Sequence, residues 1–238
     1  MLELQDICYS VEENGVRKDI LKHINLKVDE RFIAITGPNG SGKSTLAKMI
    51  AGIITPTEGK ILFDGMDITQ SSITDRAKMG ISYAFQQPVR FKGLTVKNLI
   101  TLAAGTKLSI ADACEYLSEV GLCARDYINR EVNASLSGGE LKRIEIAMIL
   151  ARSPKLSVFD EPEAGIDLWS FNNLIKVFEN MYEKINGSIL IISHQERILN
   201  IADKIIMLVD GEVKAVGCRE EVLPELLCGS GVCNKIVQ

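Results

Sequence analysis

The sequence predicts an α/β fold with three parts: a mainly parallel β-sheet core, an N-terminal antiparallel β region and an inserted helical subdomain. Residues 2–9 and 24–30 alternate apolar and polar side chains, as two paired, half-exposed strands do. After residue 152, short apolar runs alternate with helical patterns, which is typical of a parallel sheet covered by helices. Residues 94–134, between these regions, have mostly helical patterns and interrupt the α/β core.

The bulk composition limits the class of protein. The chain has 238 residues, 46% of them hydrophobic, which allows one large core with a subdomain. Its formal net charge of −4 gives no indication of a nucleic-acid-binding protein, because such proteins are usually basic. The N-terminus carries early acids, and no apolar run reaches membrane-spanning length. We therefore expect a cytoplasmic protein whose contact with any membrane is made through a partner.

Six cysteines are scattered along the chain, at positions 8, 114, 123, 218, 228 and 233. The last two enclose four residues in CGSGVC and could form a ligand pair or a redox pair. The two-residue spacing of common zinc and redox motifs is missing, so reduced thiols are the preferred interpretation. A contact of Cys218, Cys228 and Cys233 with iron or a cluster stays open.

The stretch GPNGSGKS, Gly37–Ser44, carries the strongest chemical signal because it follows an apolar run and opens a helical pattern. Glycines permit the close approach by which successive backbone N–H groups converge on a phosphate, and the helix N-terminus adds positive potential. Lys43 can reach the β- and γ-phosphates, and the Ser44 hydroxyl can bind Mg²⁺. A chance match is the alternative, which the strand–loop–helix context disfavours. The predicted nucleotide contacts are Gly37, Pro38, Asn39, Gly40, Ser41, Gly42, Lys43, Ser44 and Thr45.

The stretch LSVFDEP, residues 156–162, is an apolar strand that ends in two acids. Beside a phosphate loop, Asp160 can hold the water shell of Mg²⁺. Glu161 points elsewhere and can orient and polarise the attacking water. Taken alone, the two acids would more often be solvated groups at a strand end, so this interpretation depends on the phosphate loop.

Two further polar residues follow predicted strands. His194, in IISHQ, can hydrogen-bond the γ-phosphate, although a lone histidine is more often structural. Gln86, in AFQQP, lies where a strand leads into the helical region and can sense metal or attacking water. A polar loop residue is the alternative for that glutamine.

The stretch SLSGGELKR, residues 135–143, can simply start a helix, with Ser137 as the N-cap and Glu140 completing a capping box. Two adjacent glycines are poor helix formers, however, unless backbone has to approach something closely. The sequence therefore raises the question of what approaches Gly138 and Gly139.

Together these stretches resemble the ABC-type ATPase family over essentially the whole chain, because GPNGSGKS, AFQ, LSGGE, VFDEP, AGID and SH occur in that order. The resemblance implies a P-loop NTPase fold, ATP hydrolysis, and ATP and Mg²⁺ as cofactors. It implies a nucleotide-binding α/β core of residues 1–87 and 152–238 and a helical signature subdomain of residues 88–151, within one domain of residues 1–238. The implied roles are the lid glutamine and metal contact for Gln86, the signature for Ser137, Gly138, Gly139 and Glu140, the D-loop aspartate for Asp167, and the switch histidine for His194.

In this family the signature meets the γ-phosphate bound by the phosphate loop of a second subunit. This chain has one phosphate loop and one signature. The resemblance therefore implies a homodimer that forms on ATP binding, with two composite sites related by two-fold symmetry.

The local strings SVEE, DRAKMGISYAFQQPV, SGGELKR and SHQERIL look most like the SufC-type ATPase of iron–sulfur cluster assembly. Val11 also stands where a usual transporter ATPase has an aromatic residue for adenine, and Tyr9 is two residues away. The first hypothesis is thus an ATPase that drives a soluble SufB/SufD-like scaffold. The alternative is the ATP-binding subunit of a transporter with a membrane permease. A non-enzymatic nucleotide-binding regulator is the third hypothesis, and Glu161 argues against it.

Overall fold

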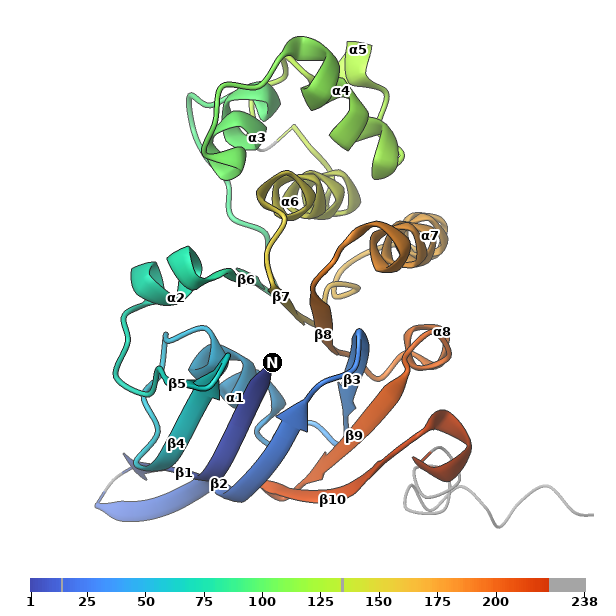
Figure 1. Ribbon diagram of the computed structural model, residues 1–238. Helices are drawn as coiled ribbons and strands as arrows, with labels where there is room; N and C mark the ends of the chain where they lie inside the picture. Colours follow the sequence, from blue (N-terminus) through green and yellow to red (C-terminus); the bar gives the residue numbers. More distant parts are fainter. Residues whose placement is uncertain (14, 134, 223–238) are drawn as a thin grey trace, which may run out of the picture. The chain divides into compact units, whose positions relative to one another are not determined.

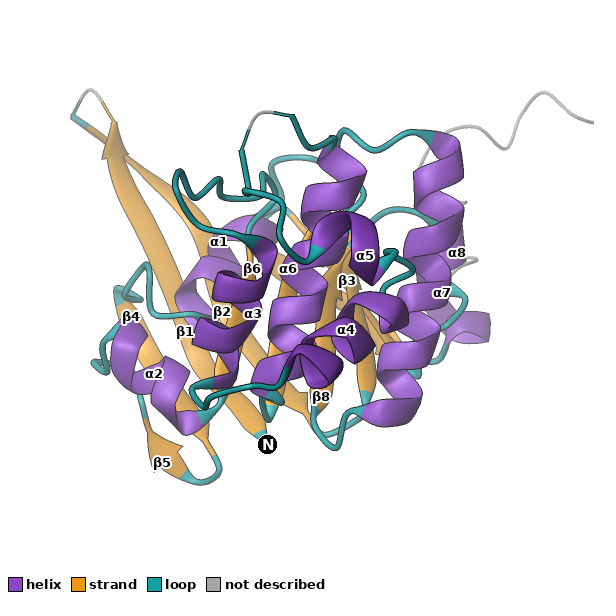
Figure 2. Cartoon of the chain, turned by 90° about the horizontal axis from the view of Figure 1, so that it is seen from above, coloured by secondary structure: helices purple, strands orange, loops and turns teal. Residues whose placement is uncertain are grey.

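The computed structural model describes residues 1–13, 15–133 and 135–222, so Cys228 and Cys233 lie outside the described residues. The chain divides into two compact units (Figures 1 and 2). The first unit comprises Met1–Met79 and Leu190–Gln238, and the second comprises Gly80–Ile189. Among the described residues, no helix is both long enough and apolar enough to cross a membrane.

The first unit begins with a four-stranded antiparallel sheet in the order β2-β1-β4-β5. Its strands are β1 (Leu2–Glu13), β2 (Val16–Val28), β4 (Glu58–Phe63) and β5 (Met66–Asp67). Figure 2 shows β1 and β2 as two long strands that run side by side. Leu4 of β1 pairs with Leu26 of β2 on one side and with Ile61 of β4 on the other, and all three side chains are buried. The alternation read from residues 2–9 and 24–30 thus places one face of this sheet in the core.

The same unit carries strands in the order β10-β9-β3-β8, namely β3 (Phe32–Thr36), β8 (Ser188–Ile192), β9 (Lys204–Val209) and β10 (Glu212–Gly217). β3 and β9 are parallel, with Ile35 opposite Ile206, and β10 returns antiparallel to β9. All five residues of β3 are buried, as expected for a central parallel strand. Among its described residues, the unit carries helices α1 (Lys43–Ile50), α2 (Ile73–Met79) and α8 (Glu196–Leu199), and residues 219–222 are also helical.

In the second unit, β6 (Ile81–Ala84) is parallel to β7 (Leu156–Asp160). Its helices are α3 (Val96–Ala104), α4 (Ile110–Glu119), α5 (Ala124–Tyr127), α6 (Gly138–Arg152) and α7 (Leu168–Lys184). Helix α6 packs against α3, α4 and α7 (Figure 1). It buries residues on several sides, including Leu141, Ile144 and Ile146. A helix that is apolar on several sides is a core helix, so α6 is the centre around which the insert is built.

The predicted α/β fold, with its antiparallel N-terminal region and helical insert, is confirmed.

Sequence patterns did not indicate helix α2, yet its Arg76 is among the most deeply buried side chains, with 1% exposure. Arg76 donates to the carbonyl oxygens of Met49 (2.7 Å), Ile50 (3.0 Å), Thr69 (2.9 Å) and Ser71 (3.1 Å). Met49 and Ile50 end helix α1, where the regular intrahelical hydrogen bonds run out. The Met49 carbonyl oxygen also accepts from the Gly52 N–H at 3.1 Å. The guanidinium therefore caps the helix that starts at Lys43.

We predict that Arg76→Met lowers the free energy of unfolding by about 3 kcal/mol, because four backbone carbonyls, three of them in buried contacts, lose a charged donor. Urea unfolding followed by circular dichroism measures the change. Arg17→Met is the matched control, since the Arg17 side chain is 67% exposed and its partner Asp19 is exposed as well; we expect a loss below about 0.5 kcal/mol there. Equal losses in the two variants would contradict the capping role of Arg76.

Candidate functional site

The phosphate loop, Gly37–Ser44, connects β3 to α1 in the first unit. Gly37 has φ 139°, and a Cβ atom there would overlap the carbonyl oxygen of Leu208 on β9. Gly42, the N-cap of α1, has φ 95°, and its Cβ would lie 2.7 Å from Leu21 Cδ2. Both positions therefore need glycine for close packing as well as for backbone conformation.

Lys43 is buried inside the loop, with 5% exposure. Its Nζ donates to the carbonyl oxygens of Gly37 and Pro38, both at 2.9 Å. The Ser41 hydroxyl is also buried and has no hydrogen-bond partner among the described residues. A buried hydroxyl without a partner costs free energy, which a phosphate oxygen would recover. The donors of this loop therefore fit a nucleotide phosphate.

The remaining predicted contacts of the loop have different exposures. Pro38, Asn39 and Gly40 are exposed, whereas Ser44 and Thr45 are half-buried at the start of α1.

In the same unit, His194 is exposed, two residues after the end of β8. The backbone N–H of the preceding residue, Ser193, donates to the carbonyl oxygen of Ile35 on β3 at 3.1 Å. The strand end that carries His194 is therefore held beside the strand that leads into the phosphate loop.

Asp160, the last residue of β7, is 2% exposed in the second unit. Its Oδ2 accepts a hydrogen bond from the hydroxyl of Tyr83 on β6 at 2.9 Å. Burial, together with the negative charge of Asp160, raises the pKa of Tyr83 above its usual value, so the phenol stays protonated and donates. No sequence signal pointed to Tyr83; only the pairing of β6 with β7 brings it to the carboxylate.

Glu161 and Gln86 meet directly, although they lie 75 positions apart. The Gln86 amide Nε2 donates to Glu161 Oε2 at 2.7 Å. Glu161 also has φ 44°, in the left-handed region, which costs a residue other than glycine about 1 kcal/mol or more. Strain of this kind at a strand end is common at functional sites. The structure thus joins two of the predicted catalytic residues.

Ser137 forms the N-cap of α6, and the predicted capping box is present. The Glu140 backbone N–H donates to Ser137 Oγ at 3.2 Å, and the Ser137 N–H donates to Glu140 Oε2 at 2.6 Å. The two glycines differ: Gly138 is exposed, whereas a Cβ on Gly139 would lie 3.0 Å from the Ser170 side chain of α7. Packing of α6 on α7 therefore explains Gly139, and only Gly138 has its backbone open to an approaching group.

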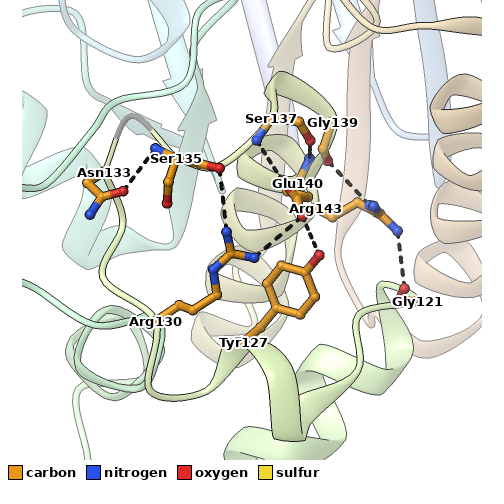
Figure 3. Close-up of polar contacts among 9 residues, drawn as sticks. All are labelled: Gly121, Tyr127, Arg130, Asn133, Ser135, Ser137, Gly139, Glu140 and Arg143. Carbon is orange, nitrogen blue, oxygen red and sulfur yellow. Dashed lines mark hydrogen bonds and ion pairs between the residues drawn. The ribbon is translucent and has the colours of Figure 1, made fainter.

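Figure 3 shows how the Glu140 carboxylate is held. Its Oε1 accepts from the hydroxyl of Tyr127 and lies 3.7 Å from Arg130 Nη1, while the Arg130 guanidinium stacks 5.1 Å over the Tyr127 ring. Partial burial would raise the pKa of Glu140, but the bonds from Tyr127 and Ser137 outweigh it and lower that pKa. The carboxylate is thus ionised and bound within its own chain, and its predicted contact with nucleotide stays a prediction.

Asp167 is exposed at the start of α7, where its Oδ1 accepts from the Ser170 backbone N–H at 3.0 Å. This bond makes Asp167 a helix cap.

Among the described residues, no three histidine, cysteine, aspartate or glutamate side chains converge as a metal cluster. Mg²⁺ needs few protein ligands because it keeps waters and binds substrate phosphates. The buried, oriented carboxylate of Asp160 is a ligand type that suits this ion, and the metal roles of Ser44, Gln86 and Asp160 stay predictions.

A sequence profile described as ABC transporter matches residues 21–164. The chain belongs to the ABC transporter family. It is 44% identical, over 92% of its length and 91% of the relative's, to an uncharacterized ABC transporter ATP-binding protein of Methanocaldococcus jannaschii. It is 36% identical, over 98% of its length and 89% of the relative's, to a putative ABC transporter ATP-binding protein of Pyrococcus horikoshii.

Among solved structures, this ABC ATPase resembles the dimeric, post-hydrolysis state of the ATP-binding cassette MJ0796 bound to ADP and Pi. The TM-score is 0.81 at 26% identity, over 92% of this chain and 98% of that chain. As a member of the family, this protein is an ATPase that uses ATP with Mg²⁺. The predicted enzyme class and cofactors are thereby confirmed.

The predicted likeness to the SufC-type ATPase is not supported by these relatives, whose names describe transporter ATP-binding proteins. Three of the four strings that suggested it, DRAKMGISYAFQQPV, SGGELKR and SHQERIL, contain the family motif residues AFQ, SGGE and SH. The correction concerns the subfamily and the partner and leaves the family intact.

We predict that Gly37→Ala weakens ATP binding about tenfold or more, because two backbone segments would have to separate to admit the methyl group. Binding of a fluorescent ATP analogue measures the dissociation constant. Gly65→Ala is the matched control: its φ of 79° imposes similar strain, but nothing lies within 4 Å of the added Cβ. Weakened binding in Gly65→Ala as well would assign the effect to general destabilisation.

Proposed function

We propose that this protein is the ATP-hydrolysing subunit of an ABC membrane transporter and that it works as a pair of identical chains. The observation that carries the hydrolytic role is the contact between Gln86 and Glu161, next to the buried Asp160. A polarising carboxylate held by an amide at the end of a core strand is suited to activating water. The transporter role is supported by the names of the relatives.

The proposed mechanism divides the work among the predicted residues. The backbone of Gly37–Ser44 cradles the phosphates, and Lys43 turns its ammonium from the loop carbonyls toward the β- and γ-phosphates. Bound Mg²⁺ would neutralise charge that develops on the phosphates. Asp160 and Ser44 would hold that ion.

Water activation falls to the residues that follow the strands. Glu161 accepts a proton from the attacking water, and Gln86 holds the carboxylate in place for that transfer. His194 donates a hydrogen bond to the γ-phosphate. Glu161 keeps the base role predicted from its place after the strand, and His194 keeps the switch role that the resemblance implied. The support of Glu161 by Gln86 is an addition to its implied role as lid glutamine.

The proposed pairing follows from the signature. Ser137 and the backbone of Gly138 are exposed at the N-terminus of α6, where N–H groups and the helix dipole favour an anion. We propose that this end meets the γ-phosphate on a second copy, as the resemblance to a dimeric cassette supports. Asp167 would face the same interface.

The proposed partner is a permease, with the ATPase on the cytoplasmic side. Apolar side chains support a docking surface near the lid glutamine: Phe85, Val89 and Phe91 are 43%, 47% and 36% exposed. Exposed apolar clusters of this kind mark protein contacts. The helical signature subdomain of residues 88–151 would carry most of that surface.

A SufB/SufD-like soluble scaffold is the second candidate partner, favoured by the string SGGELKR and by Val11 at the adenine position. Purification from the native organism, with cytosol and detergent-solubilised membranes processed in parallel, separates the two. A permease in the membrane fraction supports the transporter role. A soluble partner alone would overturn it.

We predict that Glu161→Gln lowers kcat for ATP hydrolysis about 100-fold or more, because the amide cannot accept the proton from water. ATP binding should persist, and size-exclusion chromatography with MgATP should show a trapped dimer. Glu163→Gln nearby serves as the control acid. Unchanged turnover in Glu161→Gln would remove that residue from the base role.

We also predict complementation between Lys43→Ala and Ser137→Arg, each inactive alone. An equal mixture should recover about one quarter of the wild-type rate, because half of the dimers then contain one intact composite site. Turnover of the mixture against each variant alone is the measurement. Lack of recovery would contradict the placement of Ser137 at the partner's nucleotide.

A further inference from the structure

Helix α6 carries a buried ion pair one turn beyond the signature. Lys142 Nζ lies 3.1 Å from Glu145 Oε2, and the two side chains are 2% and 18% exposed. Burial raises the pKa of Glu145, and the charge of Lys142 partly opposes that rise. An ion pair in this position is costly to desolvate and contributes little net stability. Its presence therefore calls for a role other than stability.

Both members of the pair also bind one backbone position, Phe85. Lys142 Nζ donates to the Phe85 carbonyl oxygen, and Glu145 Oε1 accepts from the Phe85 N–H at 3.3 Å. The cation thus meets the carbonyl and the anion meets the N–H, so the polarity of the pair matches the polarity of the peptide groups. Phe85 directly follows β6, where the regular ladder with β7 ends.

Holding Phe85 has two consequences for the catalytic residues. The next residue, Gln86, donates to Glu161 at 2.7 Å, so its reach depends on where the Phe85 backbone lies. The Phe85 ring also packs edge-on against Tyr83, with ring centroids 4.9 Å apart, and Tyr83 holds Asp160. The contacts of Lys142 and Glu145 with the Phe85 backbone, called here the Phe85 clamp, are therefore linked to both Asp160 and Glu161.

We propose that Lys142 and Glu145 are positioning residues for Gln86: through the two polar groups of Phe85 they fix the lid glutamine on Glu161 and tie it to the signature helix. This inference rests on the proposed hydrolytic function of Gln86 and Glu161. It makes the helix that begins at Ser137 the support of the lid glutamine. A shift of the signature would then move Gln86 and change its hydrogen bond to the Glu161 carboxylate.

The central test is the set Lys142→Met, Lys142→Met with Glu145→Met, and the charge swap Lys142→Glu with Glu145→Lys. We expect each to lower kcat about tenfold or more while the dissociation constant for ATP changes less than twofold. The swap keeps a buried ion pair but sets a carboxylate against the Phe85 carbonyl and an ammonium against its N–H. Full activity in the swap would overturn the proposal, because an ion pair alone would then suffice.

A second measurement asks whether the effect passes through Gln86. If it does, Gln86→Ala with Lys142→Met should be no slower than Gln86→Ala alone. If the double variant instead lost kcat by the product of the two single losses, Lys142 would act by a route that does not include Gln86. Glu145→Gln keeps an acceptor for the Phe85 N–H without charge, so we expect kcat within about threefold of wild type; a tenfold loss there would contradict the clamp.

Controls separate this inference from folding and from the proposed function. Lys184→Met also breaks a lysine–glutamate pair in the same unit, at Glu119, but the lysine is 54% exposed; kcat should stay within about twofold of wild type. Circular dichroism identifies any variant that does not fold, and the variants that do fold then carry the test. Wild-type protein without ATPase activity would refute the proposed function. Active wild type with equally active variants would refute only the positioning role.

Discussion

The phosphate loop depends on the absence of a side chain at Gly37, because the carbonyl oxygen of Leu208 occupies the space a Cβ would take. That approach is possible only where β3 and β9 run parallel and in register, with Thr36 opposite Met207. The loop then starts helix α1, whose opposite end is held by the Arg76 guanidinium. Strand pairing at one end and a buried cation at the other thus determine where Lys43 and Ser44 lie.

The second unit uses the same device, a pair of parallel strands that end together. Tyr83 of β6 pairs with Val158 of β7, and Ala84 pairs with Phe159. The residues after these pairs therefore emerge side by side, which explains why Gln86 reaches Glu161. Tyr83 reaches Asp160 from within the ladder. Neutral donors therefore orient both carboxylates: the Tyr83 hydroxyl holds Asp160, and the Gln86 amide holds Glu161.

The signature shows how one helix start serves several purposes. Glu140 closes the capping box and is itself bound by Tyr127 and Arg130, so side chains of the same chain hold the first turn of α6 in place. Gly139 permits tight packing on α7, and Gly138 leaves backbone exposed. A fixed helix end with open N–H groups is the arrangement that anion binding requires. Further along α6, the buried side chains of Ile144 and Ile146 anchor the helix in the core.

The sequence by itself determined the α/β class, the phosphate loop, the acids at the end of β7 and the capping box at Ser137. Each of these is local, because adjacent residues set the backbone conformation and the chemistry together. Only the tertiary structure decided that Gln86 meets Glu161, that Tyr83 meets Asp160 and that Lys142 meets the Phe85 backbone, since partners 57 to 77 positions apart leave no pattern in the chain. Such contacts depend on strand register and helix packing, which side-chain spacing does not encode. The order of the motifs along the chain was sufficient to predict the family. The subfamily inferred from short local strings was not supported.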